Sequence, residues 1–170
     1  VDSSGAKVYG EGEWKVRQHG ASKRRTWRKF HLAVEPETLE ILALEVSTND
    51  VTDDEMLPVV LNAIDEAIKI EKVCGDGGYD RSNSYQAIKK RRANAVIPPR
   101  KDAKIKQHGN SNAPPLDRDQ NLRRIRKVGR KRWKQEAGYH QRSLAETSVY
   151  RYKVTFGSTL NSRLFPSQTV

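Results

Sequence analysis

The order of strand-like and helix-like segments predicts an α/β domain in which helices flank a mixed β-sheet. A strand-like segment at 1–9 precedes a hairpin pattern at 29–48, and together they predict a three-strand meander. From 49 to 100, helix and strand patterns alternate, which is typical of crossovers between parallel strands. Helices are therefore expected on both faces of a sheet that contains antiparallel and parallel strands.

Local patterns predict each element in turn. Apolar residues alternate along both arms of the hairpin, with a turn at 36–38. Apolar Ile41 and Ala43 on the second face predict that the hairpin is covered on both sides. Residues 11–28 are rich in glycine and basic side chains, which predicts an irregular segment. The later elements are a helix at 49–68, a strand at 70–76, a helix at 81–92, a strand at 93–100 and a long helix at 139–156.

Capping residues and breakers set the expected boundaries of these elements. Thr52 or Asp53 can cap the first helix, and Asp80 or Ser82 can cap the second. Residues 101–121 are polar and rich in breakers, which predicts a mobile segment, and the basic run that follows to 135 predicts partial helix. The length of 170 residues favours a single domain over 1–170, with a basic insert at about 100–134.

Charge is strongly segregated along the chain, whose net charge is +11. Residues 100–134 hold thirteen Lys or Arg and three Asp, and residues 15–31 hold seven Lys or Arg and no acid. This density favours contact with a polyanion, most simply nucleic acid, over a merely solvated face. Trp14, Trp27 and Trp133 lie in or beside the basic stretches, and each either packs in the core or stacks on a base.

The composition also bears on the cellular location. No apolar run reaches membrane length and no secretory segment is present, so we expect a soluble cytoplasmic protein without a membrane partner. The single cysteine, Cys74, cannot form an internal disulfide bond or a cysteine metal site.

The last helix carries an acid among basic and aromatic side chains. At 100° per residue, Tyr139, Arg142, Glu146 and Lys153 project within an arc of roughly 60°. One interpretation is an exposed face with an i,i+4 ion pair between Arg142 and Glu146. The other is a functional stripe that presents one carboxylate between two cations.

Two further acids favour the functional interpretation. Asp76 ends an apolar strand and precedes Gly77 and Gly78, a frequent arrangement where a ligand approaches the backbone. Asp2 lies on the first strand-like segment. On neighbouring strands, these acids would be about 5 Å apart, which suits two divalent cations about 3.5–4 Å apart of the kind used in phosphodiester chemistry. Structurally, Asp76 could instead close a turn and Asp2 could belong to a frayed terminus.

These motifs resemble the catalytic domain of bacterial insertion-sequence DDE transposases, of insertion-sequence families four and five. Tyr139, Arg142, Glu146 and Lys153 match every interval of the family's Y-x(2)-R-x(3)-E-x(6)-K signature. The stretches "VDSSGAKVYGEGEWKVRQHG", "RRTWRKFHLAV", "GDGGYD", "AVIPPR" and "GYHQRSLAET" resemble the same group, in the same order. The resemblance covers nearly the whole chain.

The resemblance implies a ribonuclease H-like fold and metal-dependent DNA strand cleavage and strand transfer in transposition. Asp2, Asp76 and Glu146 would be the catalytic residues and would bind two Mg²⁺ ions, with Mn²⁺ as an alternative. Arg142 and Lys153 would contact DNA phosphates, and Tyr139 would help to position the DNA end. The implied partners are the DNA element ends and target DNA, and a homo-oligomer within the DNA complex is left open.

The sequence departs from the family at both ends, since its tail "RLFPSQTV" ends soon after the signature and its first strand is short. Family members have a first strand that runs several residues before the first aspartate, whereas here only Val1 precedes Asp2. We therefore expect an N-terminally truncated domain in which Asp2 is poorly fixed and independent transposition does not occur. A non-catalytic, basic nucleic-acid-binding protein is the alternative function, because it shares the charge pattern but has no use for three convergent acids.

Overall fold

The computed structural model describes residues 1–8, 27–108, 112–162 and 164–169. Its larger sheet has the strand order β3-β2-β1-β6. The first three strands form the predicted antiparallel meander, and β6 adds to β1 in the parallel direction. The strands are β1 (Asp2–Val8), β2 (Trp27–Val34), β3 (Ile41–Thr48) and β6 (Thr159–Leu160).

A second, two-stranded sheet continues the strand layer beside β1. It consists of β4 (Lys72–Cys74) and β5 (Asn94–Val96), which pair in parallel. The ammonium group of Val1 donates a hydrogen bond to the carbonyl oxygen of Cys74 at 2.8 Å. The start of β1 therefore meets the end of β4.

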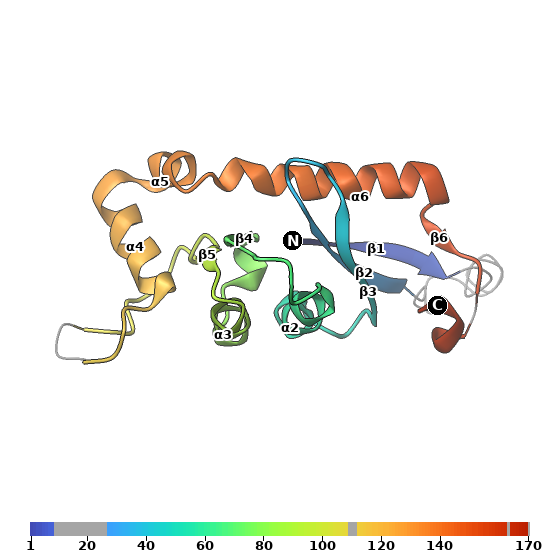
Figure 1. The fold of residues 1–170 in the computed structure, drawn as a ribbon, viewed down its shortest axis with the longest axis horizontal. Coiled ribbons are helices and arrows are strands. Elements are labelled where there is room, and N and C mark those ends of the chain that lie inside the picture. The colour runs from blue at the N-terminus through green and yellow to red at the C-terminus, as the bar shows by residue number, and fades with distance from the viewer. Residues whose placement is uncertain (9–26, 109–111, 163, 170) are drawn as a thin grey trace, which may run out of the picture.

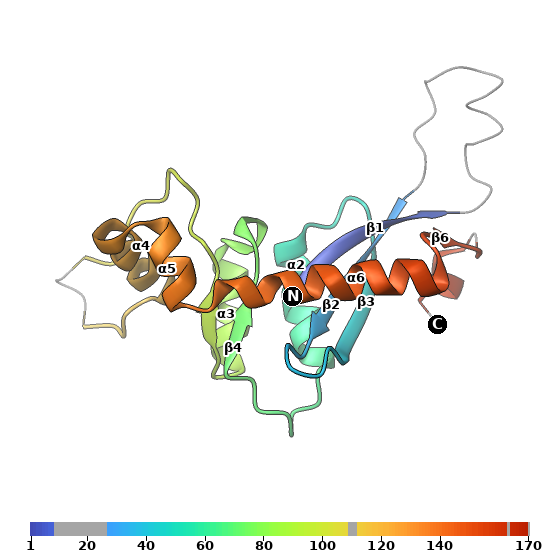
Figure 2. The same ribbon diagram turned by 90° about the horizontal axis from the view of Figure 1, so that it is seen from above.

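Helices cover both faces of the strand layer (Figures 1 and 2). The long helix α6 lies along one face, α2 and α3 lie on the other, and α4 and α5 lie at one end. The predicted α/β class, with a mixed sheet flanked by helices, is confirmed. The helices are α2 (Asp53–Ala63), α3 (Ser82–Lys90), α4 (Asp117–Val128), α5 (Arg130–Glu136) and α6 (Arg142–Phe156).

Two apolar clusters hold these layers together. The larger one joins α2 and α3 to the strands and contains fully buried Leu61, Ile88 and Ile97. The smaller one fixes α6 on the meander, where Ala145 and Val149 are buried with Phe30 and Leu32. Because α6 is anchored through one face only, its remaining side chains are available for other contacts.

Several predicted boundaries differ from the structure. The helix predicted at 49–68 covers only Asp53–Ala63, with Thr52 as its N-cap in a capping box with Glu55. The predicted cap of α3 is wrong, because Arg81 is the N-cap residue and Asp80 pairs with Arg118 instead. The predicted coverage of the hairpin on both sides is confirmed, because Ala33 and Ala43 are buried towards α2 while Phe30 and Leu32 are buried towards α6, although Ile41 at the start of β3 is 39% exposed.

The basic insert is more ordered than its composition predicts. Helix α4 begins at Asp117, so the predicted mobile segment ends earlier than 121. The buried carboxylate of Asp119 accepts hydrogen bonds from the backbone N–H groups of Lys106 and Gln107, which ties the preceding segment to α4. The irregular segment predicted at 11–28 lies almost entirely outside the described residues, and so does Trp14.

Candidate metal and nucleic-acid site

Asp2 is the first residue of β1, where it pairs with Leu32 of β2. Its side chain is only 15% exposed. Burial raises the pKa of the Asp2 carboxyl group, and the positive charge of Arg142 opposes that rise. The positive charge of Arg142 thus favours the ionised form of this largely buried carboxyl group.

Asp76 follows β4 and caps the short 3₁₀ helix η1 (Gly77–Tyr79). Its Oδ1 accepts a hydrogen bond from the N–H group of Gly78 at 2.7 Å. A Cβ atom at Gly78 would lie 2.9 Å from this same oxygen, so a larger residue there would displace the Asp76 carboxylate. The turn predicted from the sequence thus orients the carboxylate, and its second oxygen faces α6.

The guanidinium group of Arg142, at the start of α6, contacts all three predicted acids. Its Nη1 lies 2.9 Å from Oε1 of Glu146, and its Nη2 lies 3.4 Å from Oδ1 of Asp2. The same Nη2 lies 3.8 Å from Oδ2 of Asp76. Three acids that are distant in the sequence are therefore gathered around one cation.

The charges around Arg142 also act on its own ionisation. Burial alone would lower the pKa of Arg142, but the surrounding Tyr139, Asp2, Glu146 and Asp76 together raise it. The arginine is consequently held in its charged form. It compensates carboxylates that would otherwise repel one another.

The other two signature residues lie on either side of this cluster. Tyr139 belongs to the 3₁₀ turn η2 (Tyr139–Gln141), so the predicted helix starts as an α-helix only at Arg142. The Tyr139 ring packs 6.1 Å from that of Trp133. The Nζ atom of Lys153 donates a hydrogen bond to Oγ of Ser4 at 2.7 Å, which places this cation further along β1.

The donor chemistry fits a hard divalent cation. Carboxylate oxygens are the ligands that Mg²⁺ prefers in proteins, and three of them face one positive group here. Within the described ranges, no three His, Cys, Asp or Glu side chains are placed closely enough to hold one metal ion together. The guanidinium of Arg142 lies among the carboxylates and supplies the positive charge there.

A fourth acid lies beside the cluster, and the sequence did not identify it as part of the site. The Oδ2 atom of Asp53 lies 3.7 Å from the position that a Cβ atom at Gly78 would take. Its Oδ1 pairs with Nζ of Lys29 at 3.3 Å. The sequence indicated Asp53 only as a possible helix cap, because acids are common at helix starts and their presence there does not indicate a functional site.

Helices α4 and α5 carry several exposed cations. The turn η2 links α5 to the start of α6. Arg126, Lys127 and Lys131, which we call the α4–α5 basic surface, are exposed and have no carboxylate partner in the part of the chain that the structure describes. Trp133 is buried to 2% exposure, so it packs in the core and is not available to stack on a base.

The mixed sheet, the flanking helices and the acids on β1, after β4 and on the last helix define a ribonuclease H-like domain. The family model described as the transposase DDE domain matches residues 1–169, and the chain belongs to this family. The family-level function is the transposition of DNA, which agrees with the resemblance to insertion-sequence transposases. No solved structure matches the chain. No helix among the described residues is sufficiently long and apolar to cross a membrane.

Proposed function

We propose that this chain cleaves DNA strands and transfers them to target DNA in a reaction that depends on divalent cations. One observation carries the proposal: the guanidinium of Arg142 contacts Asp2, Asp76 and Glu146 together. Acids placed for salt bridges alone need not converge from three separate elements. Carboxylates that converge from separate elements are the type of ligand that a pair of divalent cations requires.

The three carboxylates would hold two Mg²⁺ ions, or Mn²⁺ in their place. Bound there, the ions supply positive charge that activates an attacking oxygen and stabilises the leaving one. Glu146 is 51% exposed and Asp76 is 43% exposed, so both carboxylates are accessible from solvent and DNA could approach them.

The basic residues would bind the substrate backbone around this centre. Arg142 and Lys153 stand on the same side of α6 as Glu146 and would contact phosphates, with Tyr139 beside the DNA end. The α4–α5 basic surface would follow the DNA further away, since its cations are exposed and lack carboxylate partners among the described residues.

A nicking assay on supercoiled DNA tests this proposal. We expect Mg²⁺-stimulated nicking by the unaltered chain and its loss in Asp76→Asn, with DNA affinity kept or increased because one negative charge is removed. Asp102→Asn removes the same charge at an exposed position and should behave like the unaltered chain. Equal nicking by both variants would contradict the metal-ligand role of Asp76.

The alternative function is a non-catalytic nucleic-acid binder, which the exposed α4–α5 basic surface favours. It predicts tight DNA binding with a steep dependence on salt, and no metal-stimulated cleavage. A structural protein with surface ion pairs predicts instead weak binding that hardly changes with salt. Measuring the salt dependence of DNA binding alongside nicking separates these three functions.

A further inference from the structure

The carboxylate of Asp53, at the start of α2, is held through one of its two oxygen atoms. Its Oδ1 lies 3.3 Å from Nζ of Lys29, and this ammonium group also donates a hydrogen bond to the carbonyl oxygen of Val51 at 2.9 Å. Its Oδ2 has no ion-pair or hydrogen-bond partner among the residues that the structure describes. The side chain is 27% exposed, so an ion in solution can reach it.

A buried histidine faces the same carboxylate. His31 is 2% exposed, and its Nδ1 has no hydrogen-bond partner in the described part of the chain. This nitrogen lies 3.8 Å from Oδ1 of Asp53, while Nε2 is bound to Oγ of Ser47 at 2.8 Å. A buried polar atom without a partner is uncommon in folded proteins. Carboxylates that bind metal ions are oriented by polar groups behind them, and both Lys29 and His31 lie behind Oδ1 of Asp53.

The other oxygen of Asp53 approaches Asp76 across Gly78. A Cβ atom at Gly78 would lie 2.9 Å from Oδ1 of Asp76 and 3.7 Å from Oδ2 of Asp53. Because glycine lacks this atom, both oxygens border the space that it would fill. The carboxylates also share their electrostatic surroundings, since burial and then the negative charges of Asp53, Asp2 and Asp76 raise the pKa of Tyr79.

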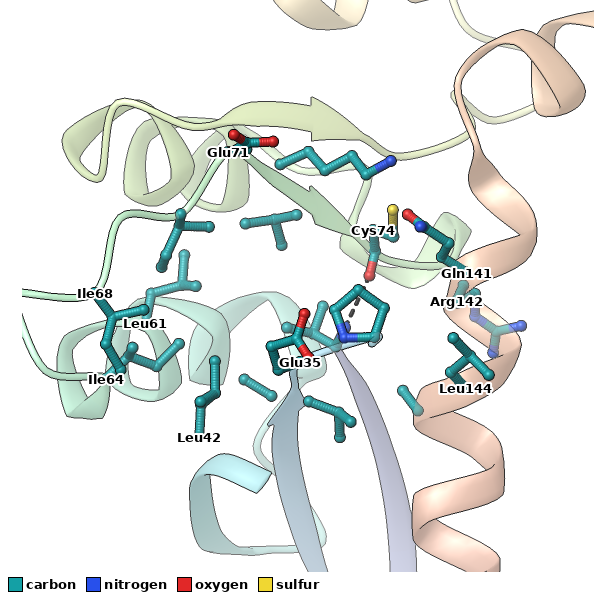
Figure 3. Close-up of a pocket in the computed structure, with 18 of the residues that line it drawn as sticks. Glu35, Leu42, Leu61, Ile64, Ile68, Glu71, Cys74, Gln141, Arg142 and Leu144 are labelled. Carbon is teal, nitrogen blue, oxygen red and sulfur yellow. Dashed lines mark hydrogen bonds between the residues drawn. The ribbon is translucent and has the colours of Figure 1, made fainter. Parts of the chain in front are cut away.

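The two oxygens of Asp76 have different surroundings. Helices α2 and α6 lie on opposite faces of the strand layer (Figure 1), and Figure 3 shows their side chains on opposite sides of the strand ends. The Oδ2 atom of Asp76 lies 3.8 Å from Nη2 of Arg142, which belongs to α6. No cation of the described residues pairs with Oδ1 of Asp76 or with Oδ2 of Asp53. The space between these two oxygens therefore lacks a compensating charge.

We propose that Asp53 is a further ligand of the divalent cation at Asp76, so that one ion lies between these two carboxylates on the α2 side. This inference rests on the proposed metal-dependent function and adds a fourth acid to its site. Mg²⁺ is commonly bound through one or two carboxylates and keeps several waters. Two acids therefore suffice, which agrees with the absence of a closer group of three metal-ligating side chains in the described ranges.

This arrangement divides the compensation of charge within the site. The guanidinium of Arg142 contacts Asp2 and Glu146 at 3.4 and 2.9 Å, and it approaches Asp76 only through Oδ2. An ion bound between Asp53 and Oδ1 of Asp76 would neutralise the two carboxylate oxygens that the guanidinium does not reach. The ion can consequently bind while Arg142 stays in place.

Isothermal titration of the full chain with Mn²⁺, without DNA, tests the inference. We expect Asp53→Asn to weaken Mn²⁺ binding at least about tenfold, since changing even the groups that orient metal ligands commonly costs about 10–100-fold. Asp54→Asn removes the same charge from the next residue in the first turn of α2. At physiological salt, which screens exposed charges beyond about 8 Å, it should change the affinity less than about twofold.

Thermal unfolding gives a second readout and a check on folding. Without ions, both variants should unfold cooperatively. At a Mn²⁺ concentration about a hundredfold above the Kd of the unaltered chain, Tm should rise by about 5–10 °C in the unaltered chain and by about half as much in Asp53→Asn. Asp53→Ser also lacks the carboxylate and suits a helix start, so it replaces Asp53→Asn in both measurements if that variant does not fold.

The possible contrary results have different meanings. Equal losses of affinity in Asp53→Asn and Asp54→Asn would assign the effect to net charge and overturn the inference. Unchanged affinity in Asp53→Asn, together with lost affinity in Asp76→Asn, would leave the proposed metal centre intact and exclude Asp53 from it. If the unaltered chain binds no Mn²⁺, both the metal-dependent function and the role of Asp53 are refuted.

Discussion

Replacing Arg142 by Gln tests how the three acids are held together. The substitution removes the cation that contacts Asp2, Asp76 and Glu146, while it keeps a polar side chain of moderate length. The carboxylates would then face one another without compensation. We expect the variant to be less stable than the unaltered chain in the absence of divalent ions, and to regain stability when Mg²⁺ is added.

The magnitude follows from the geometry. The contact with Asp2 matters most, because both side chains are largely buried, with exposures of 21% and 15%. At an effective dielectric constant of about 20, charges at this separation attract by about 5 kcal/mol, from which desolvation must be subtracted. The exposed i,i+4 contact with Glu146 adds only about 0.3–0.5 kcal/mol. A net loss of about 2 kcal/mol is expected, which lowers Tm by about 4–8 °C in a chain of this length.

Thermal unfolding with and without Mg²⁺ measures both parts of the expectation. Arg151→Gln removes the same charge from an exposed position of α6 and serves as the control. If Mg²⁺ raises the Tm of Arg142→Gln no more than that of Arg151→Gln, then the acids do not form a cation site and the reasoning is refuted. Isothermal titration with Mg²⁺ gives the corresponding affinities without reference to catalysis.

Three further predictions concern the scaffold. Burial lowers the pKa of His31, so the stability contributed by its neutral imidazole is present above about pH 6.5 and is lost as pH falls through the pKa of the folded state. His31→Gln should reduce this loss of stability in acid unfolding curves. The control His140→Gln, at an exposed position, should not reduce it. Asp80→Ala should cost about 3 kcal/mol in denaturant unfolding, because it removes a fully buried carboxylate that pairs with Nε of Arg118 at 2.8 Å and accepts a hydrogen bond from the backbone N–H of Arg100. Leu61→Ala should cost about 2–5 kcal/mol, and an unchanged midpoint would contradict its core position.

The sequence predicted the order of elements well and their ends less well. The meander was readable because its apolar residues alternate, and α6 because its helical spacing extends over four turns. The N-cap of α3 could not be predicted from the sequence, because Asp80 forms an ion pair with Arg118, 38 residues away, instead of capping the helix. Helix α4 was placed too late because its first turn is polar, and its order depends on hydrogen bonds to Asp119 that no local pattern contains.

The site was predictable to a different degree for each residue. The spacing from Arg142 to Glu146 places them in contact on any helix, so that pair needed only local geometry. The approach of Asp2 and Asp76 to the same nitrogen depends on how β1 and β4 meet, which the resemblance implied and local patterns could not supply. Asp53 was missed because its proximity to Gly78 arises from the packing of α2 against η1.

The arrangement of α6 explains how a strongly basic chain can hold a cluster of acids beside its basic residues. Acids gathered alone would repel both one another and the phosphates of DNA. Arg142 cancels part of that charge where Asp2 is largely buried, and Lys153 supplies a cation about three turns further along the same helix. Because both cations stand on the helix that carries Glu146, moving α6 would displace the acid and its compensating charges together. The spacing of the signature residues therefore also serves the electrostatic balance of the acids.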